Sequence, residues 1–176
     1  GGKFAEDKLS YNLQLGAFEP FQAIDTLLPL TLLDASITWS LHSSLRMTVG
    51  QAVLPGMRER LFSSSQMLFS SRSSIGQNFT TDRGLGYQLH WQPMLGSAQL
   101  VVDGAISTGE GLDFFLESPT FGNGLLYSGR MTFLPLGPMT EEELASEYSI
   151  DVTQKLGLAF GGGYSFNDNA FRSWGS

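Results

Sequence analysis

The side chains with the clearest chemical potential in this chain are its arginines. A guanidinium group is planar and permanently charged, and it donates two parallel hydrogen bonds to a phosphate or carboxylate. Four arginines fall in one segment, residues 54–83, which has only two acidic residues although the whole chain has a net charge of −7. Two more fall on the polar side of segments with alternating hydrophobicity. The pattern predicts an anion-binding set made of Arg58, Arg60, Arg72, Arg83, Arg46 and Arg130.

A structural role for the four arginines of residues 54–83 is equally open. They could pair with the neighbouring acids Glu59 and Asp82, or with carboxylates elsewhere on the wall of the protein. In that case they would hold their segment in place and bind no solute. Both interpretations stand at this point.

No other cluster of residues points to catalysis or to metal binding. His90 lies between Gln88 and Gln92 with no second histidine near it, so we expect a hydrogen bond there and no metal. The acidic run 141–151 lacks the alternate ligand spacing of a calcium loop. The chain has no cysteine to supply a thiolate, and its serines form no GxSxG motif. We therefore predict a protein that is not an enzyme and that uses neither a metal nor a cofactor.

The elements that position these residues are expected to be β-strands. From Leu33 to Leu41 every second residue is apolar and the residues between them are polar, and residues 45–53 repeat this pattern after a short turn. A period of two is that of a strand with one polar and one apolar face, and two such arms form an antiparallel hairpin. The same alternation predicts about seven strands, at 9–17, 33–41, 45–53, 84–92, 98–107, 125–133 and 156–164.

Strand and loop lengths favour a membrane barrel over a soluble sandwich. The predicted strands have the roughly 9–11 residues that a tilted strand needs to cross a bilayer, against about 5–6 in soluble sheets. Short and long connections alternate, as they do in outer-membrane barrels. The short connections are 42–44 and 93–97, and the long ones are 18–32, 54–82 and 108–124. The connection 135–154 departs from this alternation, because it is long where a short one is expected.

Aromatic residues and composition agree with this interpretation. One group of rings falls near the short-turn ends of the strands and another near the long-loop ends, as at the two interfaces of a membrane. The first group is Trp39, Trp91, Tyr11 and Phe133, and the second is Tyr127, Tyr164 and Phe166. Only 15% of the residues are charged, against roughly 25% in soluble domains. No run approaches the ~20 apolar residues of a spanning helix. We therefore expect an all-β fold, an antiparallel transmembrane β-barrel.

The barrel is expected to be incomplete. About seven strands is an odd number, whereas single-chain bacterial barrels close with an even one. An open edge facing lipid would also leave unpaired backbone groups at several kcal/mol each. Residues 1–176 would then be one contiguous part of a larger barrel domain.

Short motifs follow one another along the chain: LPGMRER at 54–60, DRGLGYQL at 82–89, STGEG at 107–111, YSGR at 127–130 and FNDNA at 166–170. Their order resembles the phosphate-selective porin O and P family in its Bacteroidetes-like form, over nearly the whole chain. The resemblance implies a sixteen-stranded trimeric outer-membrane channel, lined by arginine and lysine and narrowed by an inward-folded loop. Residues 54–83 would form that constriction loop. The chain has only Lys3, Lys8 and Lys155 as lysines, so it lacks a full basic ladder.

Three functions are therefore compared. The first is an outer-membrane porin that passes small anions such as phosphate by passive diffusion, surrounded by membrane lipid or lipopolysaccharide, as a homotrimer or part of a membrane complex. The second is a structural or accessory outer-membrane barrel within a larger assembly, with little conduction. The third is a soluble β-barrel binder, in which Ile37 and its apolar neighbours would form a core. The net charge of −7 argues against a nucleic-acid partner in all three.

Overall fold

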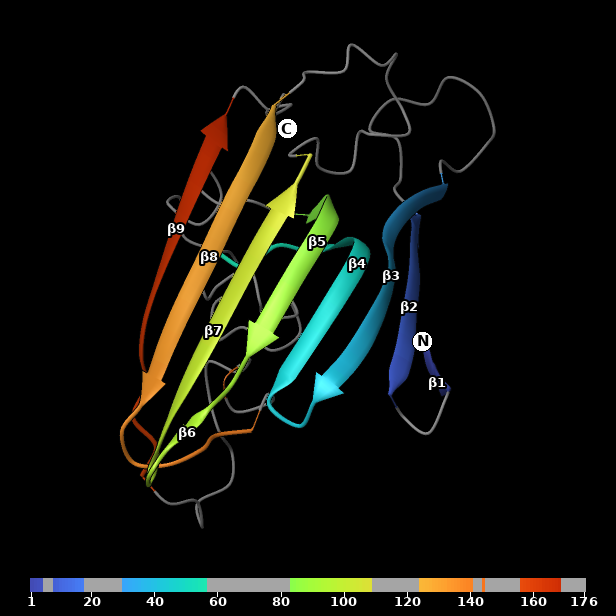
Figure 1. Ribbon diagram of the computed structural model, residues 1–176. Helices are drawn as coiled ribbons and strands as arrows, with labels where there is room; N and C mark the ends of the chain where they lie inside the picture. The colour runs from blue at the N-terminus through green and yellow to red at the C-terminus, as the bar shows by residue number, and fades with distance from the viewer. Residues whose placement is uncertain are drawn as a thin grey trace.

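The protein forms one antiparallel sheet of nine strands (Figure 1). The computed structural model describes residues 1–4, 8–17, 30–56, 83–108, 124–140, 144 and 156–168. The strands are β1 (Gly2–Phe4), β2 (Leu9–Ala17), β3 (Leu30–His42), β4 (Leu45–Val53), β5 (Arg83–Trp91), β6 (Met94–Leu95), β7 (Ala98–Ser107), β8 (Leu125–Leu134) and β9 (Phe160–Asp168). The predicted all-β, antiparallel fold is confirmed. No helix within these residues is both long and apolar enough to cross a membrane.

The predicted strands are found, with differences at their ends. The strand expected at 156–164 spans Phe160–Asp168 instead. Its partner β8 sets these limits, since Phe133 pairs with Phe160 and Leu125 pairs with Asp168. The shift is an even number of residues, so the same side chains stay on the same face. Strands β1 and β6 were not predicted, because two or three residues are too few to show a period of two.

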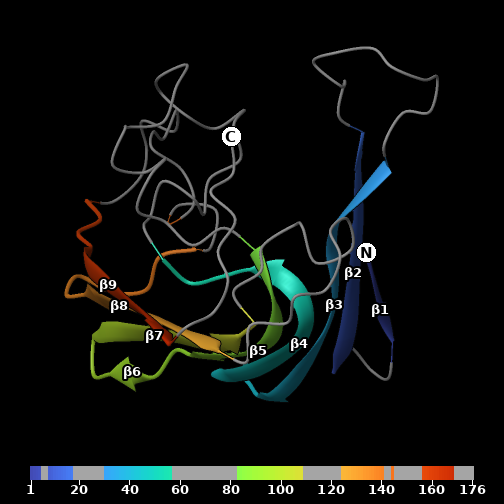
Figure 2. The same ribbon diagram turned by 90° about the horizontal axis from the view of Figure 1, so that it is seen from above.

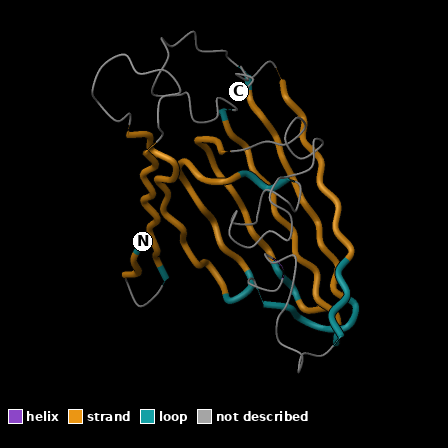
Figure 3. Tube along the Cα trace, turned by 180° about the vertical axis from the view of Figure 1, so that it is seen from behind, coloured by secondary structure: helices purple, strands orange, loops and turns teal. Residues whose placement is uncertain are grey.

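The sheet is a meander in which each long strand pairs with its sequence neighbour. Seen from above, it bends into an open arc with β1 and β9 at its two ends (Figure 2). The turns Ser43–Ser44 and Gly96–Ser97 lie at one end of the strands. The strands that flank residues 18–29, 57–82 and 109–123 begin or end at the opposite end (Figures 1 and 3). Short and long connections thus alternate between the two ends of the sheet, except that the long connection between β8 and β9 joins the strands at the end of the short turns, as the sequence indicated.

The two faces of the sheet have different chemistry along a continuous register. One row of apolar side chains crosses seven strands, and every member of it is exposed. The row consists of Tyr11, Ile37, Val49, Tyr87, Ile106, Tyr127 and Phe166. The next row lies on the other face and consists of Ser10, Thr38, Thr48, Gln88, Ala105, Ser128 and Ser165. The hydrophobic residues therefore point outward in a band, and the polar ones point into the arc.

Contacts from β4 hold β3 at one end of the sheet. The register between β2 and β3 shifts at Leu15, so that Leu33 has no partner across the ladder. Gln51 is buried and its Nε2 donates hydrogen bonds to the carbonyls of Leu32 at 2.8 Å and Leu33 at 3.0 Å. Gly50 beside it has a φ of 125°, and a Cβ there would lie 2.2 Å from the Ala35 carbonyl oxygen. Only glycine fits this approach, which brings β4 against the bulged strand.

Candidate functional site

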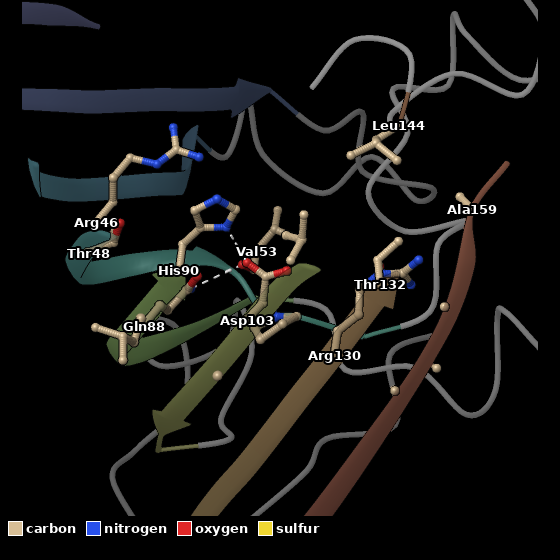
Figure 4. Close-up of a pocket in the computed structure, with 17 residues that line it drawn as sticks. Arg46, Thr48, Val53, Gln88, His90, Asp103, Arg130, Thr132, Leu144 and Ala159 are labelled. Carbon is tan, nitrogen blue, oxygen red and sulfur yellow. Dashed lines mark hydrogen bonds and ion pairs between the residues drawn. The ribbon is translucent and has the colours of Figure 1, made fainter. Parts of the chain in front are cut away.

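The concave face carries a row of charged side chains contributed by four adjacent long strands. Arg46 of β4 pairs in register with His90 of β5, His90 with Asp103 of β7, and Asp103 with Arg130 of β8. All four residues are partly buried, and their side chains project to the same side of the sheet (Figure 4). Because the strands alternate with a period of two, this row shares its face with Thr48, Gln88 and Thr132. The sheet thus gathers residues that are far apart in sequence into one polar surface.

The centre of the row is an ion-pair contact between His90 and Asp103. His90 Nδ1 lies 2.5 Å from Asp103 Oδ1, and the carboxylate accepts the ring N–H. His90 Nε2 lies 3.3 Å from Gln92 Oε1. The expectation of a hydrogen-bonded histidine is met by this geometry. The row thus places two guanidinium groups, one carboxylate and one imidazole side by side on the concave face.

A cavity of about 650 Å³ lies over this row. Its polar side includes Arg46, His90, Asp103 and Arg130. Thr48, Gln88 and Thr132 also line it, and its apolar residues and glycines include Val53, Pro55, Leu144, Ala159, Gly161 and Gly163. This volume is within the range of sites that hold organic ligands, roughly 300–1,000 Å³. The concave face therefore has room for a solute beside its charges.

The first residues after β4, Leu54–Gly56, turn inward over the concave face (Figure 2). Leu54 is only 1% exposed and packs with Ala105 and Leu126 in a small apolar cluster. Gln88 Nε2 donates to the Val53 carbonyl at 3.1 Å, and Arg130 Nη1 donates to the Gly56 carbonyl at 2.9 Å. These contacts fix the first residues of the connection against strands β5, β7 and β8.

Arg83 lies at the other end of the same connection and has a wall carboxylate as its partner. Its Nε donates to Asp34 Oδ1 at 2.8 Å, and Asp34 is 6% exposed. Asn12 Nδ2 lies 3.4 Å from the second carboxylate oxygen of Asp34. This geometry favours the structural role for Arg83, in which it ties the start of β5 to β3.

The structure places three of the six candidate arginines. Arg46 and Arg130 lie on the charged row of the concave face, and Arg83 lies in the ion pair with Asp34. The other three, Arg58, Arg60 and Arg72, lie outside the described residues. Of the expected constriction loop 54–83, the structure describes only Leu54–Gly56 and Arg83, and of the acidic run 141–151 only Leu144.

Sequence reasoning missed the roles of Leu54 and Gln88. Leu54 follows an alternating strand and was not distinguished from the rest of its loop, although the Pro55-Gly56 pair after it is a turn signal. Gln88 is one of several polar residues on β5, and nothing in the sequence shows that it reaches the Val53 carbonyl. Both roles depend on the direction that the chain takes after β4.

No protein-family model, no curated protein and no solved structure matches this chain. The sheet and its two faces therefore remain as the basis for assigning a class of protein. These define an antiparallel, curved sheet with an apolar exterior and a charged interior surface.

Proposed function

We propose that this chain is part of an outer-membrane β-barrel porin that passes small anions such as phosphate by passive diffusion. The observation that carries the proposal is the continuous row of exposed apolar side chains on the outward face, from Tyr11 on β2 to Phe166 on β9. A contiguous apolar surface of this extent marks contact with a membrane or another apolar partner. Lipid is favoured because the opposite, concave face is polar, as it is in barrels with an aqueous lumen.

Strand dimensions support a membrane-spanning role. The seven long strands have from 9 to 13 residues, which is enough to cross the hydrocarbon layer when tilted. The edges at β1 and β9 are open in the described chain. In lipid these edges require pairing, because each unsatisfied backbone group costs several kcal/mol. The proposal therefore includes closure by further strands into a larger barrel.

The inward turn after β4 supports a narrowed lumen. Leu54–Gly56 lies against the concave wall. These residues begin the segment 54–83, which resembles the inward loop of phosphate-selective porins. Arg46 and Arg130 would then face the lumen beside that loop. Rings of such charges select for anions in pores.

The alternative function is a structural or accessory outer-membrane barrel with little conduction. The observation that favours it is the engagement of two candidate arginines by the protein itself, Arg83 by Asp34 and Arg130 by the Gly56 carbonyl. In a scaffold, these contacts would be the main purpose of the arginines. Conductance and ion selectivity separate this alternative from the porin.

The test is the reversal potential of single channels in planar bilayers under a salt gradient. Replacing Arg46 and Arg130 together by glutamine should lower the anion-to-cation permeability ratio by up to about a hundredfold, because each charge changes the permeability of the anion and of the cation in opposite directions. A unit charge about 8 Å from the ion path is worth roughly 0.7 kcal/mol at a water-like effective dielectric constant of about 60, which is about threefold per charge.

The matched control removes the same charge elsewhere, by Lys3→Gln with Lys8→Gln at the β1 edge, and should leave the ratio nearly unchanged. For the loop, Arg58→Ala with Arg60→Ala should lower anion preference more than Arg172→Ala. Channels with the same reversal potential in every variant would remove the selectivity role, and absence of channels would favour the accessory barrel.

A further inference from the structure

His90 and Asp103 join two neighbouring strands through their side chains on the concave face. The two residues are register partners on β5 and β7, and His90 Nδ1 lies 2.5 Å from Asp103 Oδ1. Their side chains are 23% and 27% exposed, and both line the cavity of about 650 Å³ (Figure 4). Protons and ions in the cavity can therefore reach this pair.

Both ring nitrogens of His90 face oxygen atoms. Nδ1 faces the Asp103 carboxylate, and Nε2 lies 3.3 Å from Gln92 Oε1. A protonated imidazole has two N–H donors and satisfies both contacts, whereas a neutral ring has one donor and one acceptor. When the ring is neutral, a half-turn of the Gln92 amide lets its Nε2 donate to the ring instead. Gln92 can thus serve either charge state of His90, so the ring can take up and release a proton without repacking of the strands.

The charged groups around His90 come from the strands beside it. Arg46 is its register partner on β4 and Asp103 is its partner on β7, with Arg130 of β8 beyond Asp103. The neighbours of His90 on its own strand and face are glutamines, and the other described residues that line the cavity are uncharged. Carboxyl and guanidinium groups titrate far from neutral pH, whereas an imidazole titrates near it. His90 is therefore the member of this row whose charge changes near neutral pH.

Protonation of His90 adds one positive charge to the concave face. The size of this change is the same whatever charge the neighbouring groups carry. A positive charge lowers the energy of an anion in the space beside it and raises the energy of a cation. If the concave face lines a pore, the ratio of the two permeabilities changes with pH.

We propose that His90, with Asp103 and Gln92, is a specificity-determining proton site, and that the anion preference of the pore rises as the pH falls and His90 takes up its proton. The inference deepens the proposed function and rests on it in one respect, that the concave face lines the path of the ions. It adds the proton as a ligand that regulates selectivity.

The test is the reversal potential of single channels under a salt gradient, measured from about pH 5.5 to about pH 8.5, where imidazole groups titrate and most carboxyl groups stay ionised. The anion-to-cation permeability ratio should be up to about tenfold higher at the acid end. A unit charge about 8 Å from the ion path changes the permeability of each ion about threefold, and in opposite directions.

Two matched variants assign this effect to one ring. His90→Gln should make the permeability ratio nearly independent of pH. His42→Gln replaces the other histidine of the chain, at the exposed end of β3, and should leave the pH dependence intact.

A second measurement follows the proton directly and needs no channel. The chain has two histidines, so their ring signals in nuclear magnetic resonance spectra of the isotope-labelled protein in detergent are assigned by comparison with His42→Gln. The ring nitrogens of His90 should change from the neutral to the charged pattern within the same pH range.

A His90 ring that keeps one charge state across the range would overturn the proposal, and so would a pH dependence of the permeability ratio that survives in His90→Gln. Channels whose ratio is independent of pH overturn this inference alone and leave the porin in place. A protein that titrates at His90 but forms no channel overturns the porin, and the role of His90 in selectivity with it.

Discussion

Replacing Ile37 by arginine is expected to lower the free energy of unfolding in lipid bilayers by about 2–4 kcal/mol. Ile37 lies near the middle of β3 in the outward apolar row and is 52% exposed. In a bilayer this exposure is to hydrocarbon, where a guanidinium is poorly solvated. In water the same substitution on a half-exposed residue would cost within about 0.5 kcal/mol.

Leu41→Arg is the matched control for this prediction. Leu41 points outward from the same strand but lies next to the Ser43–Ser44 turn. At that depth the arginine can reach the interface, and the cost should fall to about 0–1 kcal/mol. Denaturant unfolding of both variants in vesicles measures the difference. Equal costs at the two positions would contradict the assignment of this face to lipid.

Removing Arg83 should also destabilise the fold strongly. Arg83→Met leaves the Asp34 carboxylate, which is 6% exposed, with Asn12 at 3.4 Å as its remaining described hydrogen-bond partner. Loss of one partner from a buried ion pair costs about 3–5 kcal/mol, and the partial exposure of the Arg83 side chain lowers the expected value to about 2–4 kcal/mol.

The double variant Arg83→Met with Asp34→Asn removes the buried charge together with its partner. It should be more stable than the sum of the single changes predicts, with a coupling energy of about 1–3 kcal/mol from a double-mutant cycle in denaturant. Additive single effects would show that Asp34 and Arg83 do not depend on each other. The same variants in bilayers distinguish a structural role of Arg83 from a role in ion selectivity. If Arg83 is structural, its replacement lowers the stability of the protein without changing the reversal potential of the channel.

The strands were predictable from the sequence because each has one polar and one apolar face. Trp39 and Ile37 alternate with Thr38 and Ser40, and this alternation survives in the structure even where strand limits shift, as in β9. The β3–β4 hairpin keeps this alternation although its register shifts between Ser40 and His42, next to the short turn. Local pattern and turn length thus determine which face each residue occupies.

The arrangement of the site was less predictable, because it depends on register across long connections. Arg46 and His90 are neighbours only because β4 and β5 pair after the connection between them, whose length does not set their alignment. The partner of Arg83 is likewise 49 residues away. Sequence reasoning assigned both Arg46 and Arg130 to the polar face, but their position in a single row required the paired strands.

The inward course of the chain after β4 depends on three-dimensional packing in the same way. Leu54 finds its apolar partners, Ala105 and Leu126, on the otherwise polar concave face. Neither residue differs in type from apolar residues that face outward, so composition does not mark the cluster. The cluster forms because one apolar residue on β7 and one on β8 lie close together among the polar residues of the concave face.

The central claim, that the apolar face meets lipid, is tested most directly by flotation of the purified protein with lipid vesicles in a density gradient. The account predicts that the protein floats with the vesicles after dilution from urea, and that without lipid or detergent it aggregates. A protein that stays monodisperse in detergent-free buffer and remains below the vesicles would contradict the membrane assignment. In that case the outward row from Tyr11 to Phe166 would have to be covered by protein.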